Sequence, residues 1–289
     1  MSRPHSPQRT LAAIISRFHN LVYFTPELRR FDDVGIDEYW HAYMAHRSAP
    51  LGRPTAPVVE ATFYNFAPRM VREAIPRVWD LIAPPDAIAL RDEAMTTALD
   101  EHLGRHLDDE SIASTADVAA DAVLDCSCVG RPLFGAHAAL PLPDHPLLRL
   151  WYATTLWREY RGDAHNIALT AAEIDGLEAH VLLGAKGVVK AEAIERIRGW
   201  TLDEWGAAID RLAERGYVEP GDTRDALAFT PAGEQLHRSI ESETDRLARG
   251  PLEALGPDDV ESIIAVLGPL ADELVERGAV PGKWPPPNA

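Results

Sequence analysis

The sequence predicts a mostly α-helical protein with two short β-hairpins, one in each half of the chain. Apolar residues recur at the spacing of one helix face through most of the 289 residues, whereas strand-like runs are short, around 58–66 and 226–229. Prolines interrupt these patterns most clearly between residues 125 and 148. We therefore expect a helical domain over 1–124, a Pro-rich linker over 125–148 and a second domain with C-terminal helices over 149–289.

The charge balance argues against nucleic acid as the main partner. The chain has 28 Lys and Arg residues against 45 Asp and Glu residues, which gives a net charge of −17. Nucleic-acid affinity comes largely from cations that neutralise phosphates, so a chain this acidic needs a strongly localised basic face to bind DNA. Its 46% hydrophobic and 25% charged residues are typical of a protein that folds throughout.

Two further observations favour the cytoplasm. The N-terminal residues hold only a short apolar run, Leu11 to Ile15, and no later stretch approaches the length of a membrane span, so no membrane partner is expected. Cys126 and Cys128 lie too close together for an ordinary disulfide and are too few for structural zinc. We favour structural or incidental thiols over a redox pair.

Three helices are predicted at the start of the second domain's main unit. Thr170 can cap a helix over 171–184, and a second short helix over 190–199 ends at a glycine. A third helix begins at a capping box, in which the Thr201 hydroxyl and the Glu204 carboxylate each satisfy a backbone N–H.

A hairpin and a long helix follow the third helix. Gly216 can turn left-handed at the end of that helix. A strand before a Pro-Gly-Asp turn and a second strand at 226–229 form the hairpin, and Thr230 with Pro231 caps and starts the fourth helix. Three helices, a two-stranded wing and a long helix are the order of a winged helix, which we place at about residues 168–250.

The segments RLAERGYVEP and LAFTPAGEQL resemble the MarR-type winged helix. They are similar to the Leu-x-x-x-Gly-Leu/Tyr-Val segment that leads into the wing in that family and to the Thr-Pro-x-Gly segment after it. The resemblance implies the fold, but the charges oppose DNA binding. Residues 201–216 carry four acidic and two basic side chains, and residues 217–230 carry three acidic and one basic.

The N-terminal half looks like a degenerate copy of this unit. Residues 36–40 echo 202–205, and residues 66–68 echo 229–231 at a similar distance downstream. An apolar stretch at 58–64 lies where a wing would be. We therefore predict tandem winged-helix units with short two-stranded wings, and chance similarity between two short segments is the alternative.

The densest polar segment lies just before the C-terminal winged helix. Within eight residues it concentrates two arginines, two carboxylates and a histidine: Arg158, Glu159, Arg161, Asp163 and His165. Glu159 or Asp163 could tune His165 near neutral pH, while either arginine could hold an anionic ligand bidentately. The alternative is a charged helix end whose residues pair to lock the domain junction.

Four further residues are candidates for ligand binding. Arg47, Tyr64 and Asn65 lie where the predicted N-terminal unit changes from helix to wing, and they could face a cleft between the two units. Trp157 belongs to an aromatic stripe that could stack a flat ligand. The alternatives are core packing for Trp157, a wing side chain for Tyr64 and a turn-former for Asn65.

No metal or cofactor is expected. His102 and His106 have i,i+4 spacing, but Gly104 lies between them and no glutamate occupies the metalloprotease base position. The sequence also contains no P-loop, dinucleotide-binding glycine motif or nucleophile elbow.

Nearly the whole chain resembles an uncharacterised actinobacterial helix-turn-helix family. That family shares a segment like Arg-Glu-(His or Tyr)-Arg-Gly-Asp-x-His, which is residues 158–165 here. The segments HRSAPLG at 46–52, FYNFAP at 63–68 and GRPLFGAHAALPLP at 130–143 are similar as well. The resemblance implies a fold and a set of residues, but no activity.

We therefore predict a winged-helix protein that binds a small anionic or aromatic molecule and is not primarily DNA-binding. Metal-free acid/base chemistry is one form of this prediction: Glu159 and His165 would exchange protons, Asp163 would orient the imidazole, and Arg158 or Arg161 would hold the ligand. The alternative is a MarR-like, ligand-responsive transcriptional regulator, which would act as a homodimer.

Overall fold

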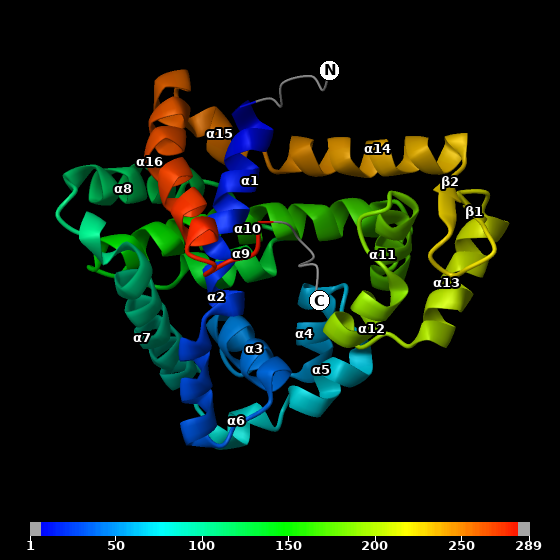
Figure 1. Cartoon of the computed structure of the whole chain (residues 1–289), viewed down its shortest axis with the longest axis horizontal. Helices are drawn as coiled ribbons and strands as arrows, with labels where there is room; N and C mark the ends of the chain where they lie inside the picture. The colour runs from blue at the N-terminus through cyan, green and yellow to red at the C-terminus, as the bar shows by residue number, and fades with distance from the viewer. Residues whose placement is uncertain (1–6, 283–289) are drawn as a thin grey trace. The chain divides into compact units, whose positions relative to one another are not determined.

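The computed structural model describes residues 7–282, which are mostly helical (Figure 1). Strands β1 (Val218–Pro220) and β2 (Leu227–Phe229) form one two-stranded antiparallel sheet. The chain divides into two compact units. Unit 1 comprises residues 7–54, 77–163 and 248–282, and unit 2 comprises residues 55–76 and 164–247.

These divisions fall at other positions than the expected 125–148 linker. That stretch contains helix α9 (Pro132–Ala138), and helix α10 (Pro146–Ala171) begins just before its end. Helix α10 supplies residues up to Asp163 to unit 1 and residues from Ala164 to unit 2. The prolines at 132 and 146 therefore start helices, where the missing backbone N–H would have had no helical partner.

Unit 1 is entirely helical. Its elements besides α9 and the first part of α10 are α1 (Pro7–His19), α2 (Leu21–Phe24), η1 (Pro26–Val34), α3 (Tyr39–Ser48), η2 (Ala49–Leu51), α6 (Val78–Leu81), α7 (Pro84–Leu103), η3 (Gly104–His106), α8 (Glu110–Leu124), α15 (Gly250–Ala254) and α16 (Pro257–Glu276). Helix α1 packs against α16, and α7 packs against η1 and α3. The C-terminal helix thus completes a core that the N-terminal helices begin.

The core of unit 1 encloses large apolar side chains and one arginine. Phe18, Phe31, Met44 and Trp151 are at most 2% exposed, and Arg91 is equally buried at 2%. A buried guanidinium must be paired, because an isolated charge is costly to remove from water. The partners of Arg91 lead to the site described below.

Unit 2 contains the element order that the sequence predicts for its C-terminal half. Besides the sheet and the end of α10, its elements are α4 (Ala56–Phe63), α5 (Pro68–Ala74), α11 (Gly176–Ala185), α12 (Ala191–Arg198), α13 (Leu202–Glu214) and α14 (Pro231–Leu247). Strands β1 and β2 pair antiparallel, with Val218 opposite Phe229. Three helices, two strands and a long helix follow one another as predicted.

The predicted capping residues of unit 2 are largely confirmed. Thr201 and Glu204 form both bonds of a capping box at α13. Gly216 is left-handed, with φ of 73°. The Thr230 hydroxyl accepts the backbone N–H of Gly233 and so caps α14. These caps depend only on neighbouring residues, which is why the sequence predicts them well.

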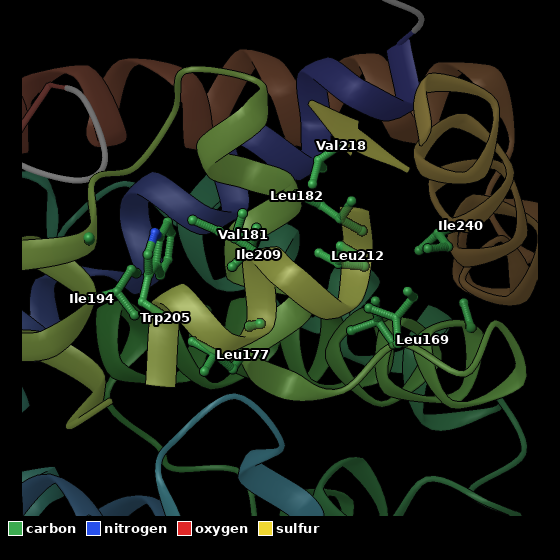
Figure 2. Packing of buried hydrophobic residues seen from close by; sticks show 14 residues of the cluster. Leu169, Leu177, Val181, Leu182, Ile194, Trp205, Ile209, Leu212, Val218 and Ile240 are labelled. Atoms are coloured by element: carbon green, nitrogen blue, oxygen red, sulfur yellow. The ribbon is translucent and has the colours of Figure 1, made fainter. Parts of the chain in front are cut away.

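An apolar core joins the helices and the sheet of unit 2 (Figure 2). Trp205, Ile209 and Leu212 of α13 point into it and are 1%, 5% and 0% exposed. They meet residues of α11, such as Val181, and of the first strand, such as Val218. The one-face spacing of apolar residues along α13 is therefore what seats this helix in unit 2.

The predicted N-terminal wing is wrong. Residues 58–63 belong to α4, which begins with Pro57 in its first turn, and the Thr62 hydroxyl donates to the Val58 carbonyl within the helix. The apolar, β-branched run reads as a strand by composition, but so short a run is equally compatible with a buried helix segment. Without this wing, the tandem arrangement of two winged helices loses its main support.

Two helix starts also differ from prediction. Helix α10 continues through Thr170, and α11 is capped instead by Asp175, which forms a capping box with Glu178. Near residues 36–40, helix α3 begins at Tyr39 and its N-cap Glu38 makes no side-chain capping bond. The resemblance of this segment to the start of α13 therefore does not extend to the cap.

Within residues 7–282, no helix has both the length and the apolar character needed to cross a membrane.

Candidate functional site

A small polar pocket lies within unit 1. Its wall consists of His19, Val22, Tyr23, His46, Arg47, Arg91, His137, Trp151, Thr155 and Glu159, which come from α1, α2, α3, α7, α9 and α10. Its empty space, the open mouth included, is about 230 Å³. The cavity itself is about 10 Å³, roughly the room that one water molecule needs, so a larger ligand would have to lie partly in the open mouth.

Helical spacing explains how α10 lines the pocket. Trp151, Thr155 and Glu159 follow one another at intervals of four residues, so their side chains lie on one face of the helix. Their side chains change along this face from aromatic to hydroxyl to carboxylate. The same helix thus supplies both an apolar wall and an acidic group.

An ion cluster of Arg47, Arg158 and Glu159 forms the charged end of the pocket. Arg47 Nη2 lies 3.0 Å from Glu159 Oε2, and Arg158 Nη1 lies 2.7 Å from Glu159 Oε1. The Glu159 side chain is 2% exposed, and that of Arg47 is 13% exposed. Burial alone would raise the pKa of Glu159, but the two guanidinium groups hold it well below its ordinary value. Glu159 is therefore a fixed negative charge at neutral pH.

Two tyrosines complete this cluster. Arg47 Nη1 donates to Tyr43 Oη over 2.9 Å, and the Arg158 guanidinium lies 5.4 Å from the centre of the Tyr23 ring. Burial raises the pKa of Tyr23 to above its ordinary value, so its hydroxyl stays protonated. The two tyrosines thus supply a hydroxyl group and a ring face to the arginines.

His19 is locked as a neutral hydrogen-bonding group. The Thr155 hydroxyl donates to the Trp151 carbonyl, so its oxygen accepts from His19 Nδ1 at 3.0 Å. His19 Nε2 consequently accepts from Tyr23 Oη at 3.1 Å. Burial, aided by the charge of Arg158, lowers the pKa of His19 well below its ordinary value.

Two more neutral histidines line the pocket. His137 Nδ1 donates to the Leu133 carbonyl over 2.9 Å, and burial lowers the pKa of His137 to about 4. Burial, with the charges of Arg91 and Arg47, also lowers the pKa of His46 well below its ordinary value. His46 Nε2 is buried and has no hydrogen-bond partner. Such an atom is costly to bury unless a water or ligand satisfies it.

Arg91 closes the pocket on the α7 side. Its guanidinium lies 2.8 Å from Asp92 Oδ1 and donates to Tyr152 Oη over 2.7 Å. It also lies 5.3 Å from the ring centres of Trp151 and Tyr152. Asp92 thus balances the charge of Arg91, but Asp92 is not part of the pocket wall.

Among the predicted site residues, the structure brings Arg47, Arg158 and Glu159 together. Arg47 and Glu159 are 112 positions apart in sequence, yet they form a buried pair. Asp163 lies one turn further along α10 and accepts the backbone N–H of Phe134 over 2.9 Å, near the start of α9. Burial raises the pKa of Asp163 to about 6. Its visible contact is therefore with the backbone of α9.

Glu159 and Asp163 belong to unit 1, whereas His165 belongs to unit 2. Residues two apart on a helix face different sides, so Asp163 and His165 are not neighbours on α10. In unit 2, the Thr244 hydroxyl donates to the Ile240 carbonyl, so it accepts from His165 Nδ1 over 2.9 Å. His165 thus has Thr244 as its orienting partner.

The other predicted ligand-binding residues lie away from the pocket wall. Trp157 Nε1 donates to the Ala119 carbonyl over 2.6 Å, and the ring packs against a small core cluster. Arg161 lies on α10, half-buried. In unit 2, Tyr64 Oη donates to the Ile174 carbonyl over 2.7 Å, and the Asn65 carbonyl accepts Trp200 Nε1 over 3.0 Å. Tyr64 and Asn65 therefore fasten the α4–α5 turn within unit 2.

Sequence reasoning missed His19, His46, Arg91 and His137. Arg91 carried a usable pattern, because it sits at the buried-face spacing of α7 between Ala87 and Met95. An arginine at such a position must have a partner inside the protein. The histidines carried no such pattern, since a histidine on an apolar face is common in ordinary cores.

The exposed face of α13 is acidic. Asp203, Asp210 and Glu214 share this face at helical spacing and are exposed. Arg211 of this helix and its C-cap residue Arg215 are engaged within unit 2: Arg211 pairs with Asp175 and Glu178, and Arg215 pairs with Glu178. The predicted absence of a basic face on this helix therefore agrees with its geometry.

Within the described part of the chain, no group of three or more His, Cys, Asp or Glu side chains is arranged to hold a metal ion. His102 and His106 are separated by the end of α7, and His106 Nε2 pairs with Glu273 at 2.9 Å. Cys126 and Cys128 are free thiols, and burial raises the pKa of Cys126.

Nearly the whole chain matches a family model. The model of a helix-turn-helix family matches residues 8–281. Neither the curated proteins nor the solved structures contain a match to the chain.

Proposed function

The chain belongs to a helix-turn-helix family, and from this premise we propose that it is a small-molecule-binding protein whose ligand occupies the pocket of unit 1. The main support for this proposal is His46 Nε2. This polar atom is buried on the wall of a pocket that also holds buried charges, and it has no hydrogen-bond partner. Native proteins satisfy nearly all such atoms, so a molecule in the pocket would account for it.

In this proposal, unit 2 has kept a MarR-like winged helix but DNA is not its main partner. A recognition helix needs donors for bases and phosphates on its exposed face. Helix α13 offers Asp203, Asp210 and Glu214 there, and its two arginines are already paired. A phosphate backbone would meet repulsion on this face.

The proposal is one of binding rather than of acid/base catalysis by Glu159 and His165. Two arginines keep Glu159 ionised, so it is a poor proton carrier near neutral pH. Thr244 orients His165 within unit 2. Glu159 instead serves to hold Arg47 and Arg158 in place.

A ligand-responsive transcriptional regulator is the second candidate function. Family membership favours it, as does the order of α11, α12, α13, the two strands and α14 in unit 2. Such a regulator would act as a homodimer with its two third helices spaced about one DNA turn apart. The pocket would then be its effector site.

The proposed function is tested by a thermal-shift screen of the full-length protein. The screen uses a set of anionic, neutral and cationic small molecules of up to about six heavy atoms. We expect at least one compound to raise the melting midpoint of the wild type and to lose this effect in Arg47→Gln. The surface variant Arg53→Gln, whose partner Asp80 is also exposed, is the matched control.

Two outcomes oppose the proposal. One is that no compound raises the midpoint of the wild type. The other is that every active compound acts equally on Arg47→Gln, because the binding site would then lie outside the pocket.

A further inference from the structure

We propose that Lys186 is a modification site whose side-chain amine is acylated by small acyl thioesters, with His237 as the proton acceptor. Both residues belong to unit 2, so this inference is independent of the pocket in unit 1. The sequence contains only three lysines, Lys186, Lys190 and Lys283, of which Lys283 lies outside the described residues. Because a guanidinium stays protonated in proteins, the arginines do not compete with these amines as nucleophiles.

The main support is the contact between the two side chains. Lys186 is exposed at the C-cap of α11, and its Nζ lies 3.3 Å from Nε2 of His237 on α14. An ammonium group can only donate hydrogen bonds, so His237 Nε2 accepts and carries no proton. The imidazole is therefore neutral, with its proton on Nδ1, and its lone pair faces the amine.

The surroundings of His237 keep its ring in place and unprotonated. The ring of Phe229 on β2 stacks on it, with ring centres 5.5 Å apart and an angle of 21° between the planes. Strand β2 packs against both α11 and α14. Burial, with the charge of Lys186, lowers the pKa of His237, while the charge of Glu241, one turn further along α14, acts in the opposite direction. His237 is thus a proton acceptor at neutral pH.

An amine beside a neutral imidazole is the arrangement of an activated nucleophile. His237 Nε2 takes one proton from the Lys186 ammonium, and the neutral amine attacks the carbonyl carbon of the thioester. A C–N bond forms, the C–S bond breaks, and the departing thiolate takes up a second proton from the nitrogen. The products are an amide on Lys186 and a free thiol, and His237 releases its proton to water.

Access and charge favour a small, neutral acyl donor. A Cβ added at Gly187, the residue after Lys186, would meet nothing within 4 Å, so the end of α11 is open to an approaching molecule. The net charge of −17 repels anionic donors such as acyl phosphates. A neutral thioester offers an activated carbonyl group without that repulsion.

Acylation would also change the contacts of unit 2. An acylated lysine has lost its charge and can no longer donate to His237 as an ammonium group. The side-chain link between the end of α11 and α14 would then be lost, next to strand β2 of the wing. The modification would therefore act as a covalent switch on this part of unit 2.

The test incubates the full-length protein with S-acetyl-N-acetylcysteamine, a small neutral thioester, at about pH 7.5. Peptide mass spectrometry follows the acetylation of each lysine with time. Lys190 is the internal control, because it is an exposed lysine four residues later, at the N-cap of α12. We expect Lys186 to react at least about tenfold faster than Lys190, below the roughly 10²–10⁴-fold that general base catalysis contributes in enzymes. Equal rates at the two lysines would overturn the inference.

The variant His237→Gln separates proton acceptance from a structural role of this residue. Glutamine can still accept a hydrogen bond from Lys186, but its amide is not a base at neutral pH. The acetylation rate of Lys186 should therefore fall to that of Lys190 in the same molecule. If the ratio of the two rates is the same as in the wild type, His237 is not the proton acceptor and the proposal fails.

The pH profile is a second readout that a purely structural role of His237 would not change. As the pH falls below about 6.5, His237 gains a proton and can no longer accept one from Lys186. The charged groups that act on it are Lys186 of α11 and Glu241 of α14, whereas β2 has no charged side chain. The ratio of Lys186 to Lys190 acetylation should decline on acidification in the wild type and stay constant in His237→Gln. A constant ratio in the wild type would contradict the proposal.

Discussion

Buried histidines are the residues whose ionisation most affects this protein's response to acid. His137 lies on the pocket wall, 6% exposed, and burial holds its pKa at about 4 in the folded state. In the unfolded chain it would titrate near 6.5. Between these values the unfolded state binds a proton that the folded state does not, so acidification favours unfolding.

The resulting prediction concerns His137→Asn. The wild type should lose about 1.4 kcal/mol of unfolding free energy per pH unit below pH 6.5 through this residue alone, down to about pH 4. His137→Asn should lack this pH-dependent loss. The difference in unfolding free energy between the wild type and the variant should therefore shrink as the pH falls from 7.5 to 5. Urea unfolding at several pH values measures the difference.

His102→Asn serves as the control for this measurement. It makes the same substitution at a half-exposed histidine near the end of α7. Parallel curves for wild type and His137→Asn would show that folding does not lower the pKa of His137.

The titration of Asp163 changes the unfolding free energy in the opposite direction to that of His137 over part of the same pH range. Burial raises its folded pKa to about 6, so its contribution to stability is present below about pH 4 and is lost as the pH rises through 6. The pH dependence of wild-type stability therefore contains the contributions of both His137 and Asp163. Comparing the wild type with a variant of one residue isolates the contribution of that residue.

At the scale of elements, the α4–α5 turn depends on a close backbone approach. Tyr64 follows the last residue of α4 with a positive φ of 45°, which is unfavourable for a bulky side chain. Its carbonyl oxygen lies so near Gly176 that a Cβ there would overlap it. The start of α11 therefore requires glycine at this position.

We predict that Gly176→Ala destabilises the protein by several kcal/mol, because backbone atoms cannot give way as a flexible side chain can. Gly206→Ala is the matched substitution, since Gly206 lies inside α13 with nothing within 4 Å of the added methyl group. It should stabilise the protein by up to about 1 kcal/mol. Chemical denaturation of the two variants and the wild type measures both effects, and equal stability of all three would refute the described packing of Tyr64.

The elements also show where sequence patterns suffice. The predictions of the Thr201–Glu204 capping box and of the left-handed Gly216 are correct because both features depend on residues that are close in sequence. The run at 58–63 is a helix and not a wing because composition alone leaves a short buried segment undecided between the two.

At the scale of the whole molecule, the net charge of −17 governs how the protein meets polyanions. The acidic face of α13 makes the electrostatic potential more negative near this helix. Reversing this face should therefore change DNA affinity more than the same charge change elsewhere.

The prediction compares two triple variants with the wild type on a 30-base-pair duplex. At about 150 mM salt, the wild type should bind more weakly than roughly 10⁻⁴ M, the weak end of non-specific binding. Asp203→Lys with Asp210→Lys and Glu214→Lys should bind measurably, with an affinity that falls steeply as salt increases. Fluorescence anisotropy as a function of salt measures both quantities.

The control places three lysines on an exposed segment of unit 1, through Asp32→Lys, Asp33→Lys and Asp37→Lys, so that the net charge is the same. It should bind far more weakly than the α13 variant. Micromolar binding by the wild type would instead favour the transcriptional regulator.

The sequence by itself determined the helical class, the order of elements from α11 to α14, the caps of α13 and α14, and the acidity of the third helix. These features depend on composition and on residues close together in the chain. It also singled out Arg47, Arg158 and Glu159, although without the grouping that they adopt.

Only the tertiary structure decided that Arg47 reaches Glu159 across 112 positions, that His46 Nε2 lacks a hydrogen-bond partner, and that His165 bonds to Thr244. The physical reason is that burial and pairing of charges are set by which helices pack together. A sequence shows the charge of a residue, but the environment that tunes this charge is supplied by segments that are remote in the chain.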